Sequence, residues 1–204
     1  MNFAGAQRVP DRRVEMIIRK RFLSADDCAG LIALIDRVRR PSTITDAYGA
    51  DADFRTSETA DLPGDDALVR AVYHRLADYA GLPIAHAEAL QGQRYAPGQQ
   101  FKAHTDYFEP TGLDYFPHTA DGGQRTWTLM VYLNAPGAGG ATRFVHLDKL
   151  VQPETGKLIA WNNRLPDGGV NAHTLHAGLP VRAGTKYVIT AWFRDAPRSH
   201  PPVW

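Results

Sequence analysis

The second half of the chain alternates short strand-like runs with tight turns, and this alternation restricts its fold more than any other feature. Segments rich in Gly, Pro and Asn separate the runs, as in residues 134–140. Many short strands joined by such turns are typical of a β-sandwich or a β-barrel. We therefore predict a β body after Gly81, with strands over residues 89–95, 127–133, 142–147, 157–162 and 186–194.

The first of two expected amphipathic helices begins after Ser24, which precedes Asp27 as in a capping box. Apolar residues recur at helical spacing from Cys28 to Val38, and Pro41 limits the helix. Cys28 falls on the apolar face, so we expect a thiol packed in the core. As the single cysteine of the chain, it excludes an internal disulfide and a thiolate-rich metal site.

The remaining N-terminal segments are predicted more coarsely. A second helix is expected from about Asp65 to Ala80, with Gly81 and Pro83 at its end. The other expectations are a loose arm over residues 1–13, a strand over residues 14–22 and a mobile loop over residues 41–64.

Composition and charge exclude several classes of protein. The 204 residues include 23 Lys and Arg against 22 Asp and Glu, which gives a formal charge of +1. No run approaches the roughly 20 apolar residues of a membrane span. We therefore expect neither a nucleic-acid partner nor a membrane partner. The first ten residues lack the apolar segment of a secretion signal, so a cytoplasmic location is expected. The oligomeric state is left open.

One histidine–carboxylate pair stands apart from the other histidines. His104 and Asp106 follow a predicted strand, and residues i and i+2 of an extended chain point to the same side. A third ligand would come from His173 or His176, which both lie near the start of a later strand. Two histidines and one carboxylate leave positions open on iron(II) for a co-substrate and oxygen.

Lys186 opens the last predicted strand and has two possible roles. An edge lysine would keep that strand soluble. A lysine inside the barrel would instead be a fixed cation that needs a carboxylate partner. A dicarboxylate co-substrate, with one end on the metal and the other on Lys186, would explain both features.

A series of motifs follows in order from about Leu90 to Arg194. Its segments are Arg94-Tyr95-x-Pro97-Gly98-Gln99, His104-x-Asp106-Tyr107-Phe108, Gly122-Gly123-Gln124-Arg125-Thr126, Leu129–Asn134, Gly139-Gly140-Ala141-Thr142, Gly156-Lys157, Leu175-His176-Ala177-Gly178-x-Pro180-Val181 and Gly184-x-Lys186 up to Trp192. Together they closely resemble the prolyl 4-hydroxylase type of 2-oxoglutarate, iron(II)-dependent dioxygenase. Arg55-Thr56-Ser57 also resembles an N-terminal segment of that family.

The resemblance implies catalytic and metal-binding roles for three residues. His104, Asp106 and His176 match the iron ligands. Lys186 matches the lysine that pairs with the distal carboxylate of 2-oxoglutarate. His173 then falls outside the ligand set, and a role behind the ligands is left open for it.

The resemblance also implies binding roles around the metal. Tyr95 and Thr142 match positions that help to bind the co-substrate. Trp192 matches an aromatic residue near the iron, although core packing alone would also explain it. Arg125 matches an arginine on the substrate side, with a solvated charge at the strand end as the alternative.

The fold implied by the resemblance is α+β: a double-stranded β-helix, or jelly roll, with N-terminal helices packed on one sheet. Residues 1–204 would form a single dioxygenase domain. Within it, residues 1–85 would provide helical support and residues 86–196 the catalytic β-helix core.

The activity implied is hydroxylation of an unactivated C–H bond with Fe(II), 2-oxoglutarate and O2, with ascorbate as a further candidate cofactor. The favoured substrate is a prolyl residue in a peptide or protein. The alternatives are a free amino acid or small metabolite, or a cupin-like metal protein that does not use 2-oxoglutarate.

Several positions depart from the family pattern without touching the expected ligands. Ala141, Leu179 and Tyr187 replace residues that are often glutamate, cysteine and tryptophan. Residues 107–121 look longer than is common, and with the 41–64 loop they are expected to flank the pocket. These departures bear on the identity of the substrate rather than on the type of reaction.

Overall fold

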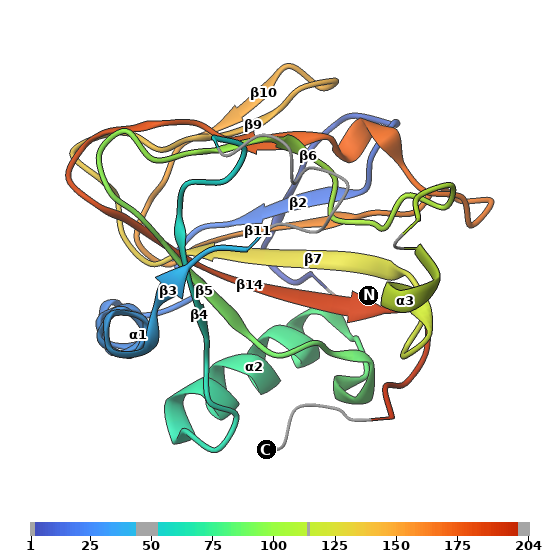
Figure 1. Ribbon diagram of the computed structural model, residues 1–204, viewed down its shortest axis with the longest axis horizontal. Helices are drawn as coiled ribbons and strands as arrows, with labels where there is room; N and C mark the ends of the chain where they lie inside the picture. The colour runs from blue at the N-terminus through green and yellow to red at the C-terminus, as the bar shows by residue number, and fades with distance from the viewer. Residues whose placement is uncertain (1–2, 44–52, 114, 200–204) are drawn as a thin grey trace.

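The computed structural model describes residues 3–43, 53–113 and 115–199. These residues form three layers: a small sheet, a large sheet beneath it and two long helices on the outer face of the large sheet (Figure 1). The two facing antiparallel sheets are those of a double-stranded β-helix, so the expected α+β fold is confirmed.

The large sheet is the middle layer, and its two longest strands lie side by side near its centre. These are β7 (Arg125–Tyr132) and β14 (Lys186–Arg194), which pair antiparallel. From edge to edge the order is β1 (Gln7–Arg8), β2 (Met16–Arg19), β11 (Lys157–Asn162), β7, β14, β5 (Gln91–Tyr95), β4 (Glu58–Asp61) and β3 (Arg40–Pro41). The N-terminal part of the chain thus adds strands to this sheet as well as helices.

The small sheet carries shorter strands. Its order is β10 (Lys149–Val151), β9 (Thr142–Phe144), β12 (His176–Gly178) and β6 (Phe101–His104). A separate pair consists of β8 (Ala138–Gly139) and β13 (Val181–Ala183). The strand predicted over residues 142–147 therefore ends early, at Phe144.

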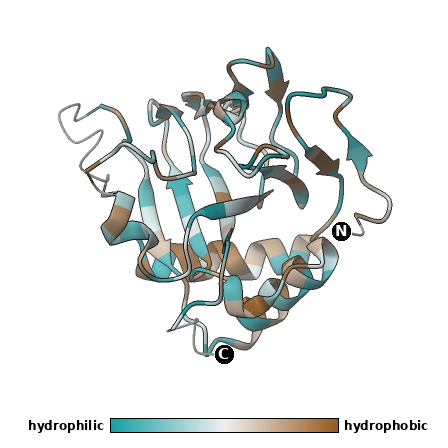
Figure 2. Cartoon of the chain, turned by 90° about the vertical axis from the view of Figure 1, so that its right-hand side faces the viewer, coloured by the Kyte–Doolittle hydropathy of each residue, from teal (hydrophilic) through white to brown (hydrophobic). Residues whose placement is uncertain are grey.

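Side chains of the central strands alternate between the two faces of the large sheet, as the period of two in a strand requires. Leu129, Val131 and Ile189 pack toward the helices, where they join one apolar cluster. Met130 and Tyr132 point toward the small sheet and belong to a second cluster. Figure 2 shows the helices lying against the outer face of the sheet. A cavity lined by Met130 lies on the other face of the sheet.

The two long helices begin and end close to the predicted positions. Helix α1 (Ala25–Val38) has the expected capping box between Ser24 and Asp27. Helix α2 (Ala67–Ala80) ends at Gly81, whose φ of 64° is the left-handed conformation that glycine adopts without strain. Cys28 is buried, and burial raises the pKa of its thiol to about 11, which makes it unreactive. Val38 departs from the predicted apolar stripe, because it is 41% exposed.

From Phe3 onward the N-terminal arm packs against the rest of the protein, contrary to the expectation of a loose segment. Phe3 is buried, and its ring centroid lies 5.6 Å from that of Tyr79 and 5.3 Å from that of Trp127. Strand β1 then pairs with β2 at the edge of the large sheet. An aromatic side chain in the core fixes the arm, and nothing in its polar sequence signals this.

The segment expected to be a mobile loop over residues 41–64 contains structure. Strand β4 pairs with β5, and β3 pairs with β4. Residues 44–52 of this segment lie outside the described residues. The described residues also form short helices, η2 (Ile84–His86), α3 (Tyr115–Thr119) and η3 (Ala172–Thr174). Among the described residues, no helix is both long and apolar enough to span a bilayer.

Candidate active site

Strand pairing in the small sheet brings two of the predicted metal ligands together. His104 ends β6 and His176 begins β12, and the two residues are direct partners in the antiparallel register. Their ring centroids are 4.3 Å apart. Asp106 follows β6, and its carboxylate oxygens lie 4.0 Å from Nε2 of His104 and 4.0 Å from Nε2 of His176. One ligand atom from each residue lies within 4.8 Å of the others.

Hydrogen bonds to the backbone orient both imidazole rings. Nδ1 of His104 lies 2.8 Å from the carbonyl oxygen of Lys102, and Nδ1 of His176 lies 2.9 Å from that of Thr174. A carbonyl only accepts, so Nδ1 carries the proton in each ring and Nε2 presents its lone pair toward Asp106. This is the tautomer that a metal ligand requires. His173, the other candidate ligand, is not part of this group.

The protonation states suit a divalent metal. Burial and the neighbouring His176 lower the pKa of His104 to about 3, so its ring is neutral. Burial by itself raises the pKa of Asp106, but His176, His104 and Arg125 outweigh it and hold this pKa below its usual range. Two imidazole nitrogens and one carboxylate on one face form the donor set of non-haem iron(II) oxygenases.

An inner cavity extends from the metal ligands between the two sheets. The four residues predicted to bind the co-substrate all line it: Tyr95, Thr142, Lys186 and Trp192. The wall also includes Trp161, which is 1% exposed and packs edge-on against His176 at 4.9 Å between ring centroids. Its indole Nε1 has no hydrogen-bond partner among the described residues. A buried donor of this kind favours a polar ligand in the cavity.

Lys186 lies at this cavity as a buried cation. The side chain is 2% exposed, and within the described ranges it has no carboxylate partner. Its Nζ lies 4.9 Å from the ring centroid of Tyr95 and 5.4 Å from that of Tyr132. Burial lowers the pKa of this lysine to about 7. The burial of Lys186 excludes the alternative of a solvated edge lysine. An anionic ligand in the cavity would supply the missing partner of its charge.

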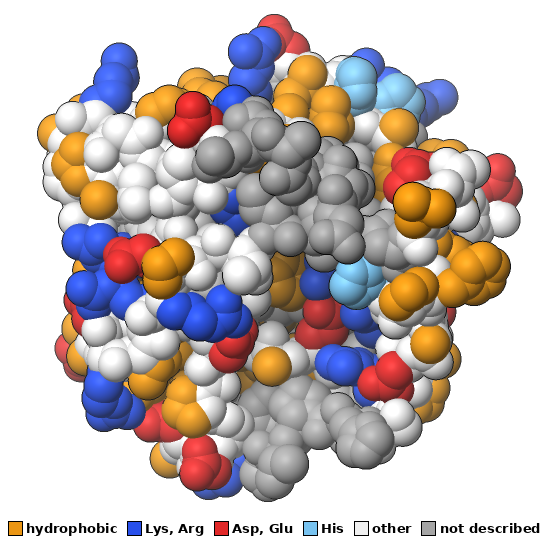
Figure 3. Space-filling model, viewed as in Figure 1, with side chains coloured by type: hydrophobic (Ala, Val, Ile, Leu, Met, Phe, Trp, Pro, Cys, Tyr) orange, Lys and Arg blue, Asp and Glu red, His pale blue; other side chains and the backbone are white. Residues whose placement is uncertain are grey.

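A larger outer pocket of about 400 Å³ opens to the surface on the other side of the metal ligands. Figure 3 shows side chains of both charges and a histidine around a hollow near the centre of this face. Residues shared by the two cavities are Arg55, Phe101, His104, Asp106 and Trp192. The metal site therefore lies where the inner cavity meets the outer pocket. Residues of both segments expected to flank the pocket, among them Thr43 and Phe108, line the outer one.

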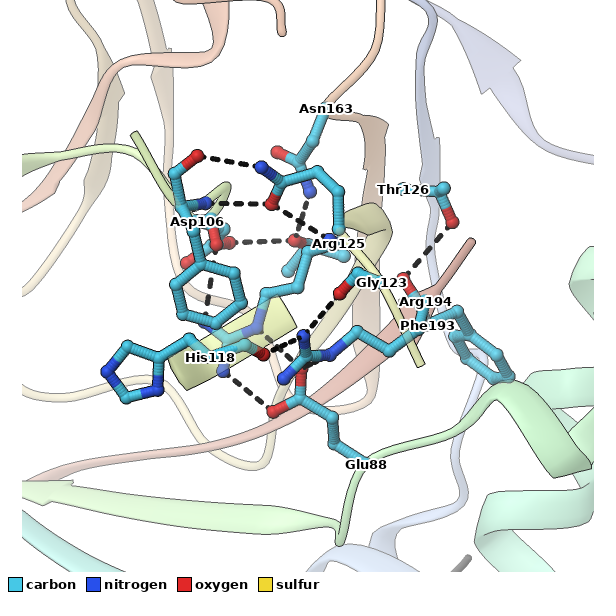
Figure 4. A network of polar contacts seen from close by, with 12 residues as sticks. Glu88, Asp106, His118, Gly123, Arg125, Thr126, Asn163, Phe193 and Arg194 are labelled. Carbon is cyan, nitrogen blue, oxygen red and sulfur yellow. Dashed lines mark hydrogen bonds and ion pairs between the residues drawn. The ribbon is translucent and has the colours of Figure 1, made fainter. Parts of the chain in front are cut away.

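Arg125 is held in the wall of the outer pocket by a partly buried ion network (Figure 4). Its guanidinium donates to both carboxylate oxygens of Glu88, at 2.6 and 2.7 Å, and to the backbone carbonyl of Asp106 at 3.3 Å. Arg194 pairs with the same carboxylate. The guanidinium also lies 4.1 Å from the ring centroid of Trp192. Arg125 is thus not the solvated charge of the alternative interpretation.

Among the residues of the site that were not predicted from the sequence, Glu88, Thr128 and Trp161 contact predicted ones. Glu88 lies 37 positions before its partner Arg125, and no motif marks it. Thr128 donates a 2.7 Å hydrogen bond to Oδ2 of Asp106, and only its place on the inward face of β7 could have indicated this. Trp161 shares the inward face of β11 with Ile159. Because this strand was predicted correctly, its period of two could have indicated that Trp161 points toward the site.

Comparison with known proteins agrees with this geometry. Residues 90–194 match the model of the 2OG-Fe(II) oxygenase superfamily. "Probable prolyl 4-hydroxylase 3" of Arabidopsis thaliana is 33% identical over 195 residues, which are 84% of this chain and 66% of that protein. "Prolyl 4-hydroxylase subunit alpha-1" of Gallus gallus is 33% identical over 145 residues, 71% of this chain and 28% of the subunit. The chain thus spans about two thirds of the first relative and much less of the second.

A solved structure has the same fold over most of the chain. It is the 2OG complex of a viral collagen prolyl hydroxylase from Paramecium Bursaria Chlorella virus-1, with a TM-score of 0.69 and 29% identity. The match covers 88% of this chain and 95% of that one. The donor set and the buried lysine fit Fe(II) and 2-oxoglutarate as cofactors. On sequence, fold and site geometry together, the chain belongs to the 2OG-Fe(II) oxygenase superfamily and is a homologue of the prolyl 4-hydroxylases.

Proposed function

We propose that this protein is a 2-oxoglutarate- and Fe(II)-dependent dioxygenase that hydroxylates a prolyl residue in a peptide or protein. The observation that carries the proposal is the position of the His104, Asp106 and His176 triad between two cavities. The inner cavity contains the buried cation of Lys186, and the outer pocket is open to a larger molecule.

The residues of the inner cavity would bind and orient 2-oxoglutarate. The ammonium group of Lys186 would pair with the distal carboxylate, because no other carboxylate of the described residues reaches it. Thr142, whose Oγ1 lies 2.6 Å from the Tyr132 hydroxyl, and Tyr95 would add hydrogen-bonding groups to the same carboxylate. Iron(II), when bound, supplies the oxidative chemistry that couples O2 and 2-oxoglutarate to C–H hydroxylation.

The residues of the outer pocket would bind the substrate and exclude water. Tyr107, Phe108 and Trp192 offer aromatic surface on which a pyrrolidine ring packs. Glu88 and Arg125 fix one side of this surface, since the ion pair restrains the guanidinium against Trp192. The names of the relatives, plant and animal prolyl 4-hydroxylases and a viral collagen prolyl hydroxylase, support a peptide substrate.

A small acidic substrate is the second candidate, and Arg55 favours it. Its guanidinium contacts the hydroxyls of Ser57 and Thr59 and the amide oxygen of Gln91, all neutral groups. Within the described part of the chain Arg55 has no ion pair, and it lines both cavities. A free amino acid or small metabolite with a carboxylate would pair with this half-buried cation.

The test is succinate release by the purified protein with iron(II), ascorbate and 2-oxoglutarate, with and without a proline-rich peptide. Succinate that the peptide stimulates, with a matching gain of one oxygen atom on the peptide, is the expected result. The matched control is His104→Ala, which removes a ligand and should abolish turnover.

Two other outcomes separate the alternatives. Succinate stimulated by free proline or another carboxylate-bearing metabolite, and not by the peptide, would move the substrate to the second candidate. No succinate from folded, iron-loaded protein with any of these substrates would overturn the proposed reaction.

A further inference from the structure

A chain of buried hydrogen bonds connects Asp106 to His176 by a route that does not pass through the strand pairing of the small sheet. It runs through Thr128, Asn163, Asn171 and Thr174, whose side chains are all 2% exposed or less. None of these four residues was predicted as part of the site.

The first half of the chain begins at the carboxylate. The Thr128 hydroxyl donates to Oδ2 of Asp106 at 2.7 Å. Nδ2 of Asn163 in turn donates to the Thr128 oxygen at 2.9 Å. With its single proton committed to Asp106, the Thr128 hydroxyl accepts from Asn163, so the direction of both bonds is fixed. Figure 4 shows Asp106 and Asn163 in the same network as Arg125.

The second half follows the loop that leads to His176. The backbone N–H of Asn171 donates to the carbonyl of Asn163 at 2.9 Å. The Thr174 hydroxyl donates to the carbonyl of Asn171 at 2.7 Å, and so does its backbone N–H at 3.0 Å. The carbonyl of Thr174 accepts from Nδ1 of His176 at 2.9 Å. These hydrogen bonds therefore also restrain the imidazole ring of His176.

Asp106 is the ligand that most needs such a restraint. Pairing of β6 with β12 fixes the relative positions of His104 and His176, but Asp106 lies beyond the end of β6. A carboxylate rotates easily about its last bond, and an outer hydrogen bond stops this rotation. Most polar groups of this buried chain are paired, and only Oδ1 of Asn163 lacks a partner among the described residues. Bonds of this kind in a low-dielectric interior hold a definite geometry.

We propose that Thr128 and Asn163 are positioning residues that fix the Asp106 carboxylate relative to His176 and so set the geometry and affinity of the metal site. This inference rests on the proposed function only in taking the triad as the metal site. It adds that the site depends on hydroxyl and amide groups that do not touch the metal.

The test is titration of the metal-free full-length protein with cobalt(II), a spectroscopic probe of ligand geometry. Thr128→Val keeps the shape of the side chain and removes the hydroxyl. It should weaken cobalt(II) binding by about 10- to 100-fold and change the visible absorption spectrum of the bound ion. Thr128→Ser restores the hydroxyl and should recover most of the affinity and the spectrum.

Thr126→Val is the matched control. Thr126 lies on the same strand, and its hydroxyl donates to the backbone carbonyl of Phe193 at 3.1 Å, away from the ligands. The same substitution there should leave the cobalt(II) affinity within about twofold of the parent. Circular dichroism and thermal unfolding of all variants establish that each is folded.

Asn163→Ala removes the hydrogen bond from Asn163 to Thr128. It also replaces Thr128→Val as the test if that variant does not fold. It should weaken cobalt(II) binding, and in the Thr128→Val background it should add little, because the two residues act in series. Parental affinity and spectrum in folded Thr128→Val, or in folded Asn163→Ala, would overturn the inference. Failure of the parent protein to bind cobalt(II) would instead count against the metal site itself.

Discussion

At the scale of single residues, the charge of Lys186 should have opposite effects on the stability of the protein and on its binding of 2-oxoglutarate. Its ammonium group lies among the rings of Tyr95 and Tyr132 instead of beside a carboxylate. Burying a charge without a partner opposes folding, whereas the same charge beside a carboxylate is stabilising. Stability and co-substrate binding should therefore respond in opposite directions to the loss of this charge.

Lys186→Met is expected to raise the thermal midpoint of the co-substrate-free protein at pH 7 and to weaken 2-oxoglutarate binding by at least tenfold. Lys157→Met is the matched control, because Lys157 is also buried but pairs with Glu154. It should lower the midpoint and leave 2-oxoglutarate binding nearly unchanged. Thermal scans with and without 2-oxoglutarate measure both effects, and a destabilised Lys186→Met protein with unchanged binding would contradict this interpretation.

The pH dependence follows from the lowered pKa of Lys186. The folded protein holds this proton only below about pH 7, whereas the unfolded chain holds it up to about 10.5. Between these values the unfolded state binds more protons, so this lysine makes stability rise with pH. The 2-oxoglutarate affinity should do the reverse and fall above about pH 7, with uptake of a proton on binding. Calorimetry in buffers of different ionisation enthalpy measures that uptake, and none at pH 8 would contradict the pairing.

The site could be predicted from sequence where the signal was local. His104 and Asp106 are two positions apart, so the sequence predicted their convergence, although Asp106 lies just beyond the end of β6. The choice between His173 and His176 did not follow from spacing and needed the family resemblance. The partnership of Glu88 with Arg125 joins segments far apart in the chain, and neither residue type indicates the other.

At the scale of secondary-structure elements, the close packing of α1 on the large sheet depends on a glycine. Gly92 of β5 faces the helix, and a Cβ there would overlap Cγ1 of Ile35. Ile35 is completely buried, so it has little room to move. The absence of a side chain at Gly92 therefore allows the helix to approach the strand that carries Tyr95.

Gly92→Ala should lower the free energy of unfolding by about 1–3 kcal/mol through overpacking. Ile35→Ala removes the overlapping Cγ1 and should recover part of that loss in the double variant, although alone it destabilises. Urea unfolding of the single and double variants measures this coupling. Strictly additive losses would show that the two side chains do not collide.

Elements were predictable where the local sequence carried a hydrophobic signal, either alternation or a continuous run. The bounds of β11 and β14 match the predicted strands, because both strands are mostly apolar and almost continuously buried. The short strands β1 and β3 have exposed residues only, so no alternation marks them. Their pairing with neighbours determines them, and that information is not local.

At the scale of the whole molecule, the large sheet separates two apolar clusters. We expect one to contribute to stability alone and the other to metal binding as well. The cluster on the helix side contains Phe3 and Trp127. The cluster on the cavity side contains Phe144, which packs against His176 at 5.5 Å between ring centroids. Substitutions in the first should affect stability alone, and substitutions in the second should also disturb the metal site.

Phe3→Ala should cost about 3 kcal/mol of unfolding free energy and leave metal affinity within about twofold, since it only opens space beside Tyr79 and Trp127. Phe144→Ala is the comparison on the other face and should weaken metal binding as well. Urea unfolding and cobalt(II) titration of both variants provide the two readouts. Equal losses of metal affinity in the two variants would contradict the separation of the clusters.

The most direct test of the central claim is an anaerobic absorption titration of the protein with iron(II) and 2-oxoglutarate. If the triad holds the metal and Lys186 anchors the co-substrate in the same cavity, a metal-to-ligand charge-transfer band should appear only when both are present. His104→Ala should abolish the band, and Lys186→Met should require more 2-oxoglutarate to produce it. No band from folded, iron-loaded protein, or an unchanged band in His104→Ala, would contradict the site described.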